Sequence, residues 1–540
     1  MKKNKSRGAV SLLLCLIMLA ACLSGCGSLS SDAENTDVQS AENQSESETE
    51  QAGTKKPDNT RFTLRYAADE SLNPYLSDNV YNEVLMSLMY ESLFRLDDNF
   101  QPIPVLCESC ETEDGLTFTI TLIEAKMHDG SDLKAGDVVY SINLARSSSK
   151  YGKRLAHVDS CYTDYDGRVV LVLDEVNYNI SALLDFPIIC TGTYADDVPA
   201  GTGPYVLKQT GTTATLKAFD EYRDKADISE KTIYLSEYED DVVEDSFSTV
   251  NLDLIWEDPN DDVDLHLYGE YESRCYDTTI LQYVGFNFNR TALKDINVRK
   301  AICCAVDRTM IVDEINSGFG READMLYNPS YYLYKSYWAE PESFSLANMS
   351  AYLAASALKD TNSDGYLEYS YDGYYDTLVL RFLVYSGSDK KVAAAQSIAD
   401  NLNRVGLNVQ VTALDWQEYL SALANGEYEL YYGEISLTHD FDFTDLLTPE
   451  GSLCYGLTGS EKYAELIAAV KEASDEEALN YAVGGLCAYA VADVPIIPVM
   501  YRQNVVYTHR GEVIGLRPTV SGIFQSVTEW HINLSKQEGE

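Results

Sequence analysis

The segment from residue 360 to residue 372 places oxygen ligands at the spacing of a calcium-binding loop. Its candidate ligands stand at positions 1, 3, 5 and 9 of the loop: Asp360, Asn362, Asp364 and Glu368. Position 6 is Gly365, which suits the sharp turn of such a loop, but position 12 is Tyr371 instead of the usual bidentate glutamate. Weak Ca²⁺ binding and a polar loop with a glycine turn both fit this pattern, and the polar loop is the favoured interpretation.

A cysteine at the end of an apolar stretch indicates a second kind of chemistry, covalent lipid attachment. Residues 2–7 carry four basic side chains, residues 9–23 are almost wholly apolar, and Ser24 and Gly25 come directly before Cys26. This order resembles a secretory leader that ends in a bacterial lipobox, whose cysteine receives a diacylglycerol after cleavage. We therefore predict that Cys26 is the lipidated first residue of the mature chain. An ordinary secretory signal with a chance cysteine is the alternative.

The mature chain is strongly acidic. The whole chain has 40 basic and 86 acidic residues, and removal of the leader would leave 36 basic residues and a formal net charge of −50. This charge argues against nucleic acid as a partner. Residues 26–60 are rich in Ser, Glu, Asp, Asn and Gln and nearly free of large apolar side chains, which predicts a disordered acidic linker.

Residues 61–540 contain no further apolar run of transmembrane length. Their number predicts an extracytoplasmic body of two or three domains with a sizeable core. Of the 12 cysteines, nine would remain after two leave with the signal peptide and Cys26 is lipidated. Nine is an odd number, and the spacing matches no zinc site, so we expect no dense disulfide scaffold.

The second half of the body alternates between strand-like and helix-like segments. The predicted strands are 376–386, 408–414 and 429–436, and the predicted helices are 390–407 and 415–428. This order predicts a parallel α/β layer, in which Asp415 is the expected N-cap of the second helix. A β-rich first half and a returning C-terminal tail flank the layer, which indicates two lobes joined by two crossings.

Four segments, in order along the chain, resemble the family 5 extracytoplasmic solute-binding proteins, the peptide- and nickel-type receptors of ABC importers. They are NPYLSDNVYNEVLMSLMYESLFRLDDNFQPIPVLCES (73–109), FTITLIEAKMHDGSDLKAGDVVYSI (118–142), GTGPYVLK (201–208) and VGFNFNRTALKDINVRKAICCAVDRTMIV (284–312). The resemblance implies an α/β, two-lobed periplasmic-binding-protein-like fold of type II, of the large cluster C type with an extra subdomain in the first lobe. The implied division is a lipoprotein signal peptide at 1–25, the linker at 26–60, a first lobe at 61–283 with a subdomain inserted at about 82–190, a second lobe at 284–494, and a C-terminal return to the first lobe at 495–540.

The resemblance also implies a ligand cleft between the lobes that closes by a hinge motion. Trp416 matches the segment whose aromatic residue lines the cleft in the family, and Tyr501 falls at a position that often faces it. Tyr75 matches an N-terminal loop that touches the ligand in relatives. For Trp416 the alternative is a core position near a helix N-terminus.

The largest departure from the family pattern is YYGEISLTHDFDFTDLL at 431–447. Peptide-binding relatives read like W-x-A-D-Y here, and their aspartate pairs with the free α-amino group of the peptide, which gives specificity for that amine. In this chain that motif is absent, and Glu434, Asp440, Asp442 and the adjacent His439 are the candidate ligand-binding residues that remain. We expect Asp440 or Asp442 to hold a cationic group of the ligand, and a solvated acidic loop is the alternative.

These features predict a monomeric lipoprotein receptor on the outer side of a bacterial cell membrane, which captures oligopeptides and delivers them to ABC permease subunits. No catalytic residue and no cofactor, apart from weakly bound Ca²⁺, is expected. A receptor for a nickel chelate, haem or an oligosaccharide with the same fold is the alternative. A glycosidase-like secreted enzyme is less consistent, because the six histidines form no HExxH motif and no GxSxG or phosphate-binding loop occurs. A sensory or adhesive lipoprotein without a transporter is a third class.

Overall fold

The structure is a computed structural model that describes most of the chain. The described residues are 60–260, 265–371, 374–456, 460–525 and 527–534. The predicted signal peptide, linker and lipidated Cys26 lie outside them. Within these ranges, no helix combines the length and the apolar character that a membrane span requires.

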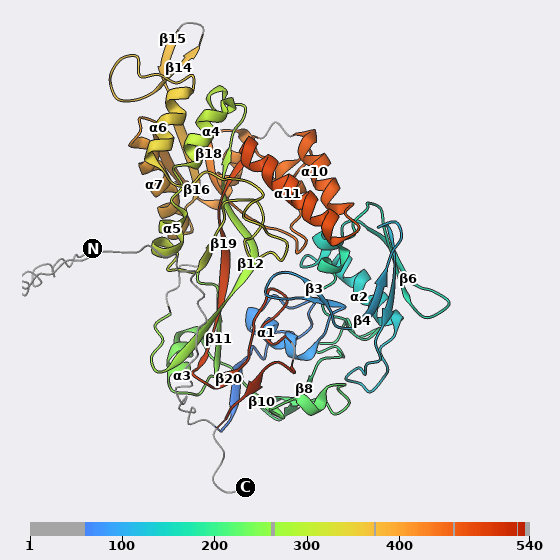
Figure 1. Cartoon of the computed structure of the whole chain (residues 1–540). Coiled ribbons are helices and arrows are strands. Elements are labelled where there is room, and N and C mark those ends of the chain that lie inside the picture. Colours follow the sequence, from blue (N-terminus) through green and yellow to red (C-terminus); the bar gives the residue numbers. More distant parts are fainter. Residues whose placement is uncertain (1–59, 261–264, 372–373, 457–459, 526, 535–540) are drawn as a thin grey trace, which may run out of the picture. The chain divides into compact units, whose positions relative to one another are not determined.

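The first lobe contains two four-stranded sheets (Figure 1). One has the order β1 (Phe62–Arg65), β10 (Thr232–Ser236), β9 (Thr213–Ala218) and β8 (Tyr205–Thr210), and only β1 and β10 are parallel. The other is antiparallel, in the order β4 (Cys107–Glu111), β5 (Thr117–Leu122), β7 (Val169–Leu173) and β6 (Val158–Thr163), and α2 (Ala135–Ser147) packs against it. Alternating apolar residues, such as Phe62 and Leu64 on β1, point into a common core that both sheets share.

A seven-stranded mixed sheet forms the second lobe and the connection between the lobes. Its order is β11 (Leu254–Glu257), β19 (Ile496–His509), β12 (Tyr271–Phe286), β18 (Leu430–Ser436), β16 (Val379–Tyr385) and β17 (Asn408–Leu414), and β13 (Gly320–Glu322) also pairs with β19. The boundary that the sequence placed between residues 283 and 284 therefore falls inside one long strand.

The two long strands β12 and β19 pair antiparallel along most of their length (Figure 1). The pairing runs from Tyr271 opposite His509 to Gly285 opposite Ile496. It is interrupted between Asp277 and Leu281, where the register shifts, and shifts again after Gln282. These two strands are the crossings between the lobes, and the interruption is a bulged segment in the middle of them.

The predicted parallel layer is confirmed. β16, α7 (Asp389–Asn403), β17, α8 (Trp416–Asn425) and β18 follow one another, and the three strands are parallel. Asp415 caps α8 by accepting a hydrogen bond from the backbone N–H of Glu418 at 2.9 Å. The carboxyl ends of the three strands therefore share one edge of the sheet.

The remaining elements surround these sheets. The other helices are α1 (Val80–Met89), α3 (Val243–Ser248), α4 (Ile296–Cys303), α5 (Arg308–Met310), α6 (Leu346–Ala355), α9 (Thr444–Leu447), α10 (Glu461–Lys471) and α11 (Glu476–Asp493). Three two-stranded sheets pair β2 (Phe94–Leu96) with β3 (Pro102–Pro104), β14 (Glu368–Tyr371) with β15 (Tyr374–Thr377), and β20 (Val513–Ile514) with β21 (His531–Ile532).

The segment Gly201–Pro204 packs closely against the end of α1. A Cβ atom on Gly203 would lie 2.4 Å from the carbonyl carbon of Met89, and one on Gly201 would lie 2.5 Å from the Met89 oxygen. The buried ring of His128 donates from Nε2 to the Gly203 carbonyl at 2.9 Å, and burial lowers its pKa to about 4. The glycines are therefore required by close backbone approach.

All nine cysteines among the described residues are free thiols, which agrees with the expectation of no dense disulfide scaffold. Burial raises the pKa of Cys107 to about 12 and that of Cys110 to about 11, so both stay protonated near neutral pH.

Candidate functional site

A cavity with a volume of about 490 Å³ opens beside the crossing strands. Three side chains from this region line one wall: Trp256 at the end of β11, Tyr276 on β12 and Asn504 on β19. Tyr276 and Asn504 are directly opposite in the strand pairing. Other parts of the lining come from α1 and from residues 519–525 and 527–528. The volume lies within the usual range for small-molecule and cofactor sites.

The polar atoms on this wall form a short hydrogen-bond chain with one unused acceptor. The Tyr276 hydroxyl accepts from Nε1 of Trp256 at 2.8 Å and from Nδ2 of Asn504 at 3.4 Å. The amide oxygen Oδ1 of Asn504 is buried and has no hydrogen-bond partner. An unpaired buried acceptor is costly, so this oxygen is suited to receive an N–H donor from a ligand.

The charged side chains that line the larger cavity are mostly paired with one another. Three pairs carry this balance: Lys150 with Glu83 at 2.6 Å, Arg154 with Asp185 at 2.5 Å, and Arg223 with Glu91 at 2.6 Å. The cavity thus presents compensated charges, which favours a ligand that is neutral overall or that carries both signs of charge.

A second cavity of about 260 Å³ lies next to the first, because the two share Tyr276, Thr519 and Val520 in their linings. It lies between the β2–β3 turn of the first lobe and Arg321 of the second. At its centre Asp277 accepts from Arg321 Nε at 2.8 Å and from Gln503 Nε2 at 2.8 Å. The two cavities together follow the crossings from the first lobe to the space between the lobes.

The comparisons with known proteins agree with the resemblance found in the sequence. The family model described as bacterial extracellular solute-binding proteins, family 5, matches residues 101–449, more than half of the chain. The chain belongs to this family. It is 23% identical over 445 residues to the oligopeptide-binding protein AppA of Bacillus subtilis, which covers 77% of this chain and 78% of that protein.

Two solved structures show the same fold as this family 5 protein. The unliganded open form of the periplasmic murein tripeptide binding protein MppA superposes with a TM-score of 0.73 at 16% identity, covering 89% of this chain and 99% of that one. The nickel ABC transporter protein from Bacillus halodurans superposes with a TM-score of 0.70 at 20% identity, covering 88% and 98%. The predicted family and the two-lobed α/β fold are thereby confirmed.

Trp416 lies at the first residue of α8, on the edge where β16, β17 and β18 end. Its side chain is 51% exposed, and its ring meets those of Tyr385 at 5.4 Å and Tyr419 at 6.0 Å between centroids. The alternative of a core tryptophan is therefore wrong. Ligands of open α/β sheets bind beyond the carboxyl ends of the strands, so contact with a ligand remains a prediction for Trp416.

Glu434 on β18 lies in a polar network that includes residues of both crossing strands. Its carboxylate pairs with Lys391 at 3.0 Å and Arg502 at 3.1 Å, and accepts from Gln282 at 2.9 Å. Arg502 also pairs with Asp258. Two cations of the chain already balance Glu434, and ligand contact by this residue stays a prediction.

Asp440 and Asp442 do not line the large cavities. Asp442 pairs with Lys471 of α10 at 2.9 Å. Asp440 accepts from Thr438 at 2.6 Å and from Asn177 of the first lobe at 3.3 Å, and burial together with the Asp442 charge raises its pKa. The cavities beside them measure about 40 and 10 Å³, room for little more than water. Because α10 brings Lys471 to the loop, Asp442 pairs with an ammonium group of the chain itself, and binding of a cationic ligand group by Asp440 or Asp442 stays a prediction.

His439 joins the two lobes through a contact with Asp185. Its Nδ1 lies 2.7 Å from Asp185, a buried residue of the first lobe, which also receives Ser521 Oγ at 2.9 Å and the Arg154 guanidinium at 2.5 Å. Burial alone would raise the pKa of Asp185, but the charges of His439 and Arg154 and its hydrogen bonds outweigh burial and hold that pKa at about 2. The group is an interlobe anchor, and ligand binding by His439 stays a prediction.

Tyr75 and Tyr501 are packed in the interior. The Tyr75 hydroxyl donates to the Pro187 carbonyl at 2.5 Å, and its ring contacts Tyr151 edge to face. Tyr501 is fully buried on β19, and its hydroxyl donates to the Leu326 carbonyl. Neither lines the two larger cavities. Both hydroxyls are satisfied by the chain itself, so these tyrosines stabilise the lobes, and their ligand contacts stay predictions.

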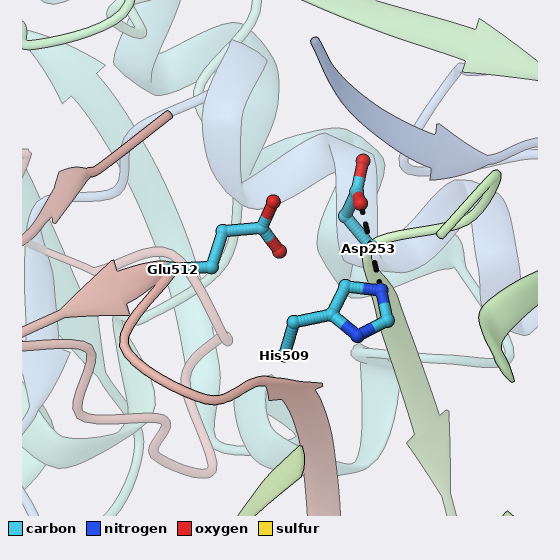
Figure 2. A group of neighbouring side chains, drawn as sticks. All are labelled: Asp253, His509 and Glu512. Atoms are coloured by element: carbon cyan, nitrogen blue, oxygen red, sulfur yellow. Dashed lines mark ion pairs between the residues drawn. The ribbon is translucent and has the colours of Figure 1, made fainter. Parts of the chain in front are cut away.

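Figure 2 shows a further group of buried ionisable side chains, Asp253, His509 and Glu512, which converge from the start of β11, the end of β19 and the turn that follows. One ligand atom of each lies within 4.8 Å of the others. Burial lowers the pKa of His509, and its Nε2 donates to the Leu252 carbonyl at 3.1 Å. Asp253 accepts from the Thr63 N–H at 2.6 Å. These bonds join β1 to β11 and β19, so the group has a structural explanation.

Sequence reasoning missed Trp256, Tyr276 and Asn504. Tyr276 and Asn504 are 228 residues apart, and only the antiparallel pairing of β12 with β19 places them together. The available sequence signal was the resemblance of the second crossing strand to the family. That resemblance pointed to Tyr501, which is three residues before Asn504.

Proposed function

We propose that this family 5 protein captures oligopeptides in the larger cavity and its continuation between the lobes, and delivers them to an ABC permease. The observation that carries the proposal is the cavity of about 490 Å³ beside the crossings, whose lining includes Asn504 with its unpaired buried acceptor Oδ1. A peptide offers N–H donors at every residue, so it can satisfy this acceptor whatever its side chains are. The names of two similar proteins, an oligopeptide-binding and a murein tripeptide binding protein, support the same ligand class.

The balanced charges of the cavity fit the same ligand. A peptide carries one positive and one negative terminus. A cavity whose lining charges are already paired accepts such a dipolar molecule without leaving a single charge buried and uncompensated. Trp256 and Tyr276 add flat apolar area beside the polar acceptor, the usual composition of a selective pocket. Binding would require lobe closure and no covalent step.

A nickel chelate is the second candidate, since a nickel transporter protein shares the fold. Among the described residues that line the larger cavity there is no histidine or cysteine. Nickel prefers imidazole nitrogen among protein ligands, so direct coordination by this cavity is disfavoured. This observation favours the peptide over the metal.

Replacing Asn504 by leucine tests the proposed site. The substitution removes the unused acceptor at similar volume, so we expect about a tenfold loss of affinity for a peptide that binds the unsubstituted protein. Titration calorimetry with di- to nonapeptide pools, Ni²⁺, haem and oligosaccharides would identify the ligand first and then measure the loss. Asn143→Leu is the matched control, because Asn143 is an exposed helix residue whose amide donates only to the Val139 carbonyl.

Two outcomes would count against this assignment. Binding of nickel, haem or sugar with no response to peptides would keep the family and discard the peptide. Peptide binding that Asn504→Leu and Asn143→Leu leave equally unchanged would move the site away from the crossing strands.

The lipid anchor at Cys26 is part of the proposed function. Tethering would raise the concentration of the receptor near its permease. We expect Cys26→Ala to abolish incorporation of a labelled fatty acid and to release the protein from the membrane fraction, whereas Cys22→Ala, four residues earlier in the leader, should change neither. Retention of label in Cys26→Ala would refute lipidation at this residue.

A further inference from the structure

The loop that connects α6 to β14 gathers three carboxylates in the second lobe. Ligand oxygens of Asp360, Asp364 and Glu368 lie within 4.8 Å of one another. Lys359 and Glu368 close the loop by two backbone hydrogen bonds, at 3.1 and 2.8 Å. The loop is thus a closed ring of backbone with acidic side chains directed to a common point.

Glu368 distinguishes this group from an ordinary acidic surface loop. The residue is only 2% exposed, and its Oε1 atom is buried with no hydrogen-bond partner. Its other oxygen, Oε2, accepts from the backbone N–H and the hydroxyl of Thr361, at 2.6 and 2.7 Å. A buried carboxylate oxygen without a donor is strongly unfavourable unless a cation approaches it.

No cationic side chain of the described residues forms an ion pair with any of the three carboxylates. Three negative charges within one loop repel each other unless an ion compensates them. The protein thus provides the negative charge of a site, and the balancing charge has to come from solution.

Backbone N–H groups of the loop hold two of the three carboxylates in position. Asp360 accepts from the N–H groups of Ser363 at 2.7 Å and Gly365 at 3.1 Å, and Asp364 accepts from that of Tyr366 at 2.8 Å. Gly365 has φ +90°, the turn for which position 6 of a calcium loop uses glycine. These bonds fix the directions of the two exposed carboxylates.

We propose that the loop 360–368 binds a calcium ion through Asp360, Asp364 and the buried Glu368, with the amide oxygen of Asn362 and water completing the coordination. The donors are all oxygen, which suits a hard cation and excludes preference for zinc or copper. The ion would attach the α6–β14 connection to the parallel sheet, since Leu367 donates to the Gly406 carbonyl at 2.8 Å. The missing glutamate at position 12 places the expected Kd at about 10⁻⁴–10⁻³ M, the range of extracellular calcium modules.

The experiment titrates Ca²⁺ into the chelator-treated mature protein and follows calorimetric heat and Tm. We expect saturation at millimolar Ca²⁺, at least tenfold weaker binding of Mg²⁺, and at least tenfold weaker Ca²⁺ binding by Glu368→Gln. Asp364→Asn is the second variant, because Asp364 is exposed and its replacement leaves the buried contacts intact, so a folding failure of Glu368→Gln would not end the test.

Asp166→Asn is the matched control. Asp164, Asp166 and Gly167 form a turn of similar spacing whose charges are already paired with Arg168, at 2.8 and 3.2 Å. This variant should bind Ca²⁺ within twofold of the unsubstituted protein. The proposal is overturned if no saturable Ca²⁺ response appears up to about 10 mM, ten times the weak end of that range, or if Asp364→Asn binds as well as Asp166→Asn.

Discussion

Replacing Asp185 by asparagine is expected to lower the free energy of unfolding by about 3 kcal/mol at neutral pH. The carboxylate receives Arg154, His439 and Ser521 within 2.9 Å and is nearly inaccessible to solvent. A neutral amide at position 185 would leave the Arg154 guanidinium and the His439 imidazole in a largely buried position without the carboxylate that compensates them. Chemical denaturation followed by tryptophan fluorescence measures this loss.

The pH dependence gives the same prediction a second readout. The pKa of Asp185 is about 2 in the folded protein and about 3.9 in an unfolded chain, so the ionised form stabilises the fold by about 2–3 kcal/mol. Because the folded-state pKa is the lower one, this contribution is complete above about pH 4 and is lost as the pH falls towards 2. The difference between the variant and the unsubstituted protein should therefore shrink in acid.

Asp445→Asn is the matched control for Asp185→Asn. Asp445 also pairs across the lobes, with Lys153 at 2.9 Å, but both side chains are partly exposed. Exposed pairs are worth at most about 1 kcal/mol, so this variant should remain close to the unsubstituted protein. Equal losses of unfolding free energy for the two variants would show that Asp185 contributes no more to stability than a partly exposed ion pair.

Replacing Gly203 by alanine should cost at least about 4 kcal/mol or prevent folding. The added Cβ would lie 2.4 and 2.6 Å from the carbonyl carbon and oxygen of Met89, atoms of the backbone that cannot rotate away. Relief requires the strand that follows Pro204 to move away from α1, which opens the core of the first lobe. Denaturant midpoints, or the yield of folded protein if the variant is too unstable, measure the effect.

Gly136→Ala separates this clash from a general effect of losing glycine. Gly136 lies in the first turn of α2, is exposed, and an added Cβ there would meet no atom within 4 Å. Alanine should leave stability unchanged or raise it by up to about 1 kcal/mol. A Gly203→Ala protein as stable as the Gly136→Ala protein would contradict the close approach to Met89.

The sequence was sufficient for local structure and for the family. The apolar runs of 376–436 predicted the parallel layer nearly residue by residue, and Asp415 caps its helix as its type and position indicated. These features depend on neighbours a few residues away. The segment Gly201–Pro204 belongs to one of the four matching segments, but the reason for its glycines, the close approach to Met89, depends on two distant parts of the chain.

The candidate site was less predictable because its chemistry depends on distant partners. Asp442 and Glu434 were expected to bind the ligand. In the structure, Lys471 of α10 and Lys391 of α7 form ion pairs with them. Asp185, which determines the role of His439, lies 254 residues earlier in the chain. A sequence shows which charges are present, whereas the fold decides which of them are already paired.

The pairing of β12 with β19 affects how the lobes can move. Two separate linkers would permit many modes of opening, whereas a hydrogen-bonded ribbon resists bending in its own plane. The register shift after Asp277 removes ladder bonds between β12 and β19 at residues 278–280, and the hydroxyls of Thr278 and Thr279 donate there to the carbonyls of Arg502 and Leu437, at 2.8 Å each. Twisting and out-of-plane bending of the ribbon should therefore concentrate at this point.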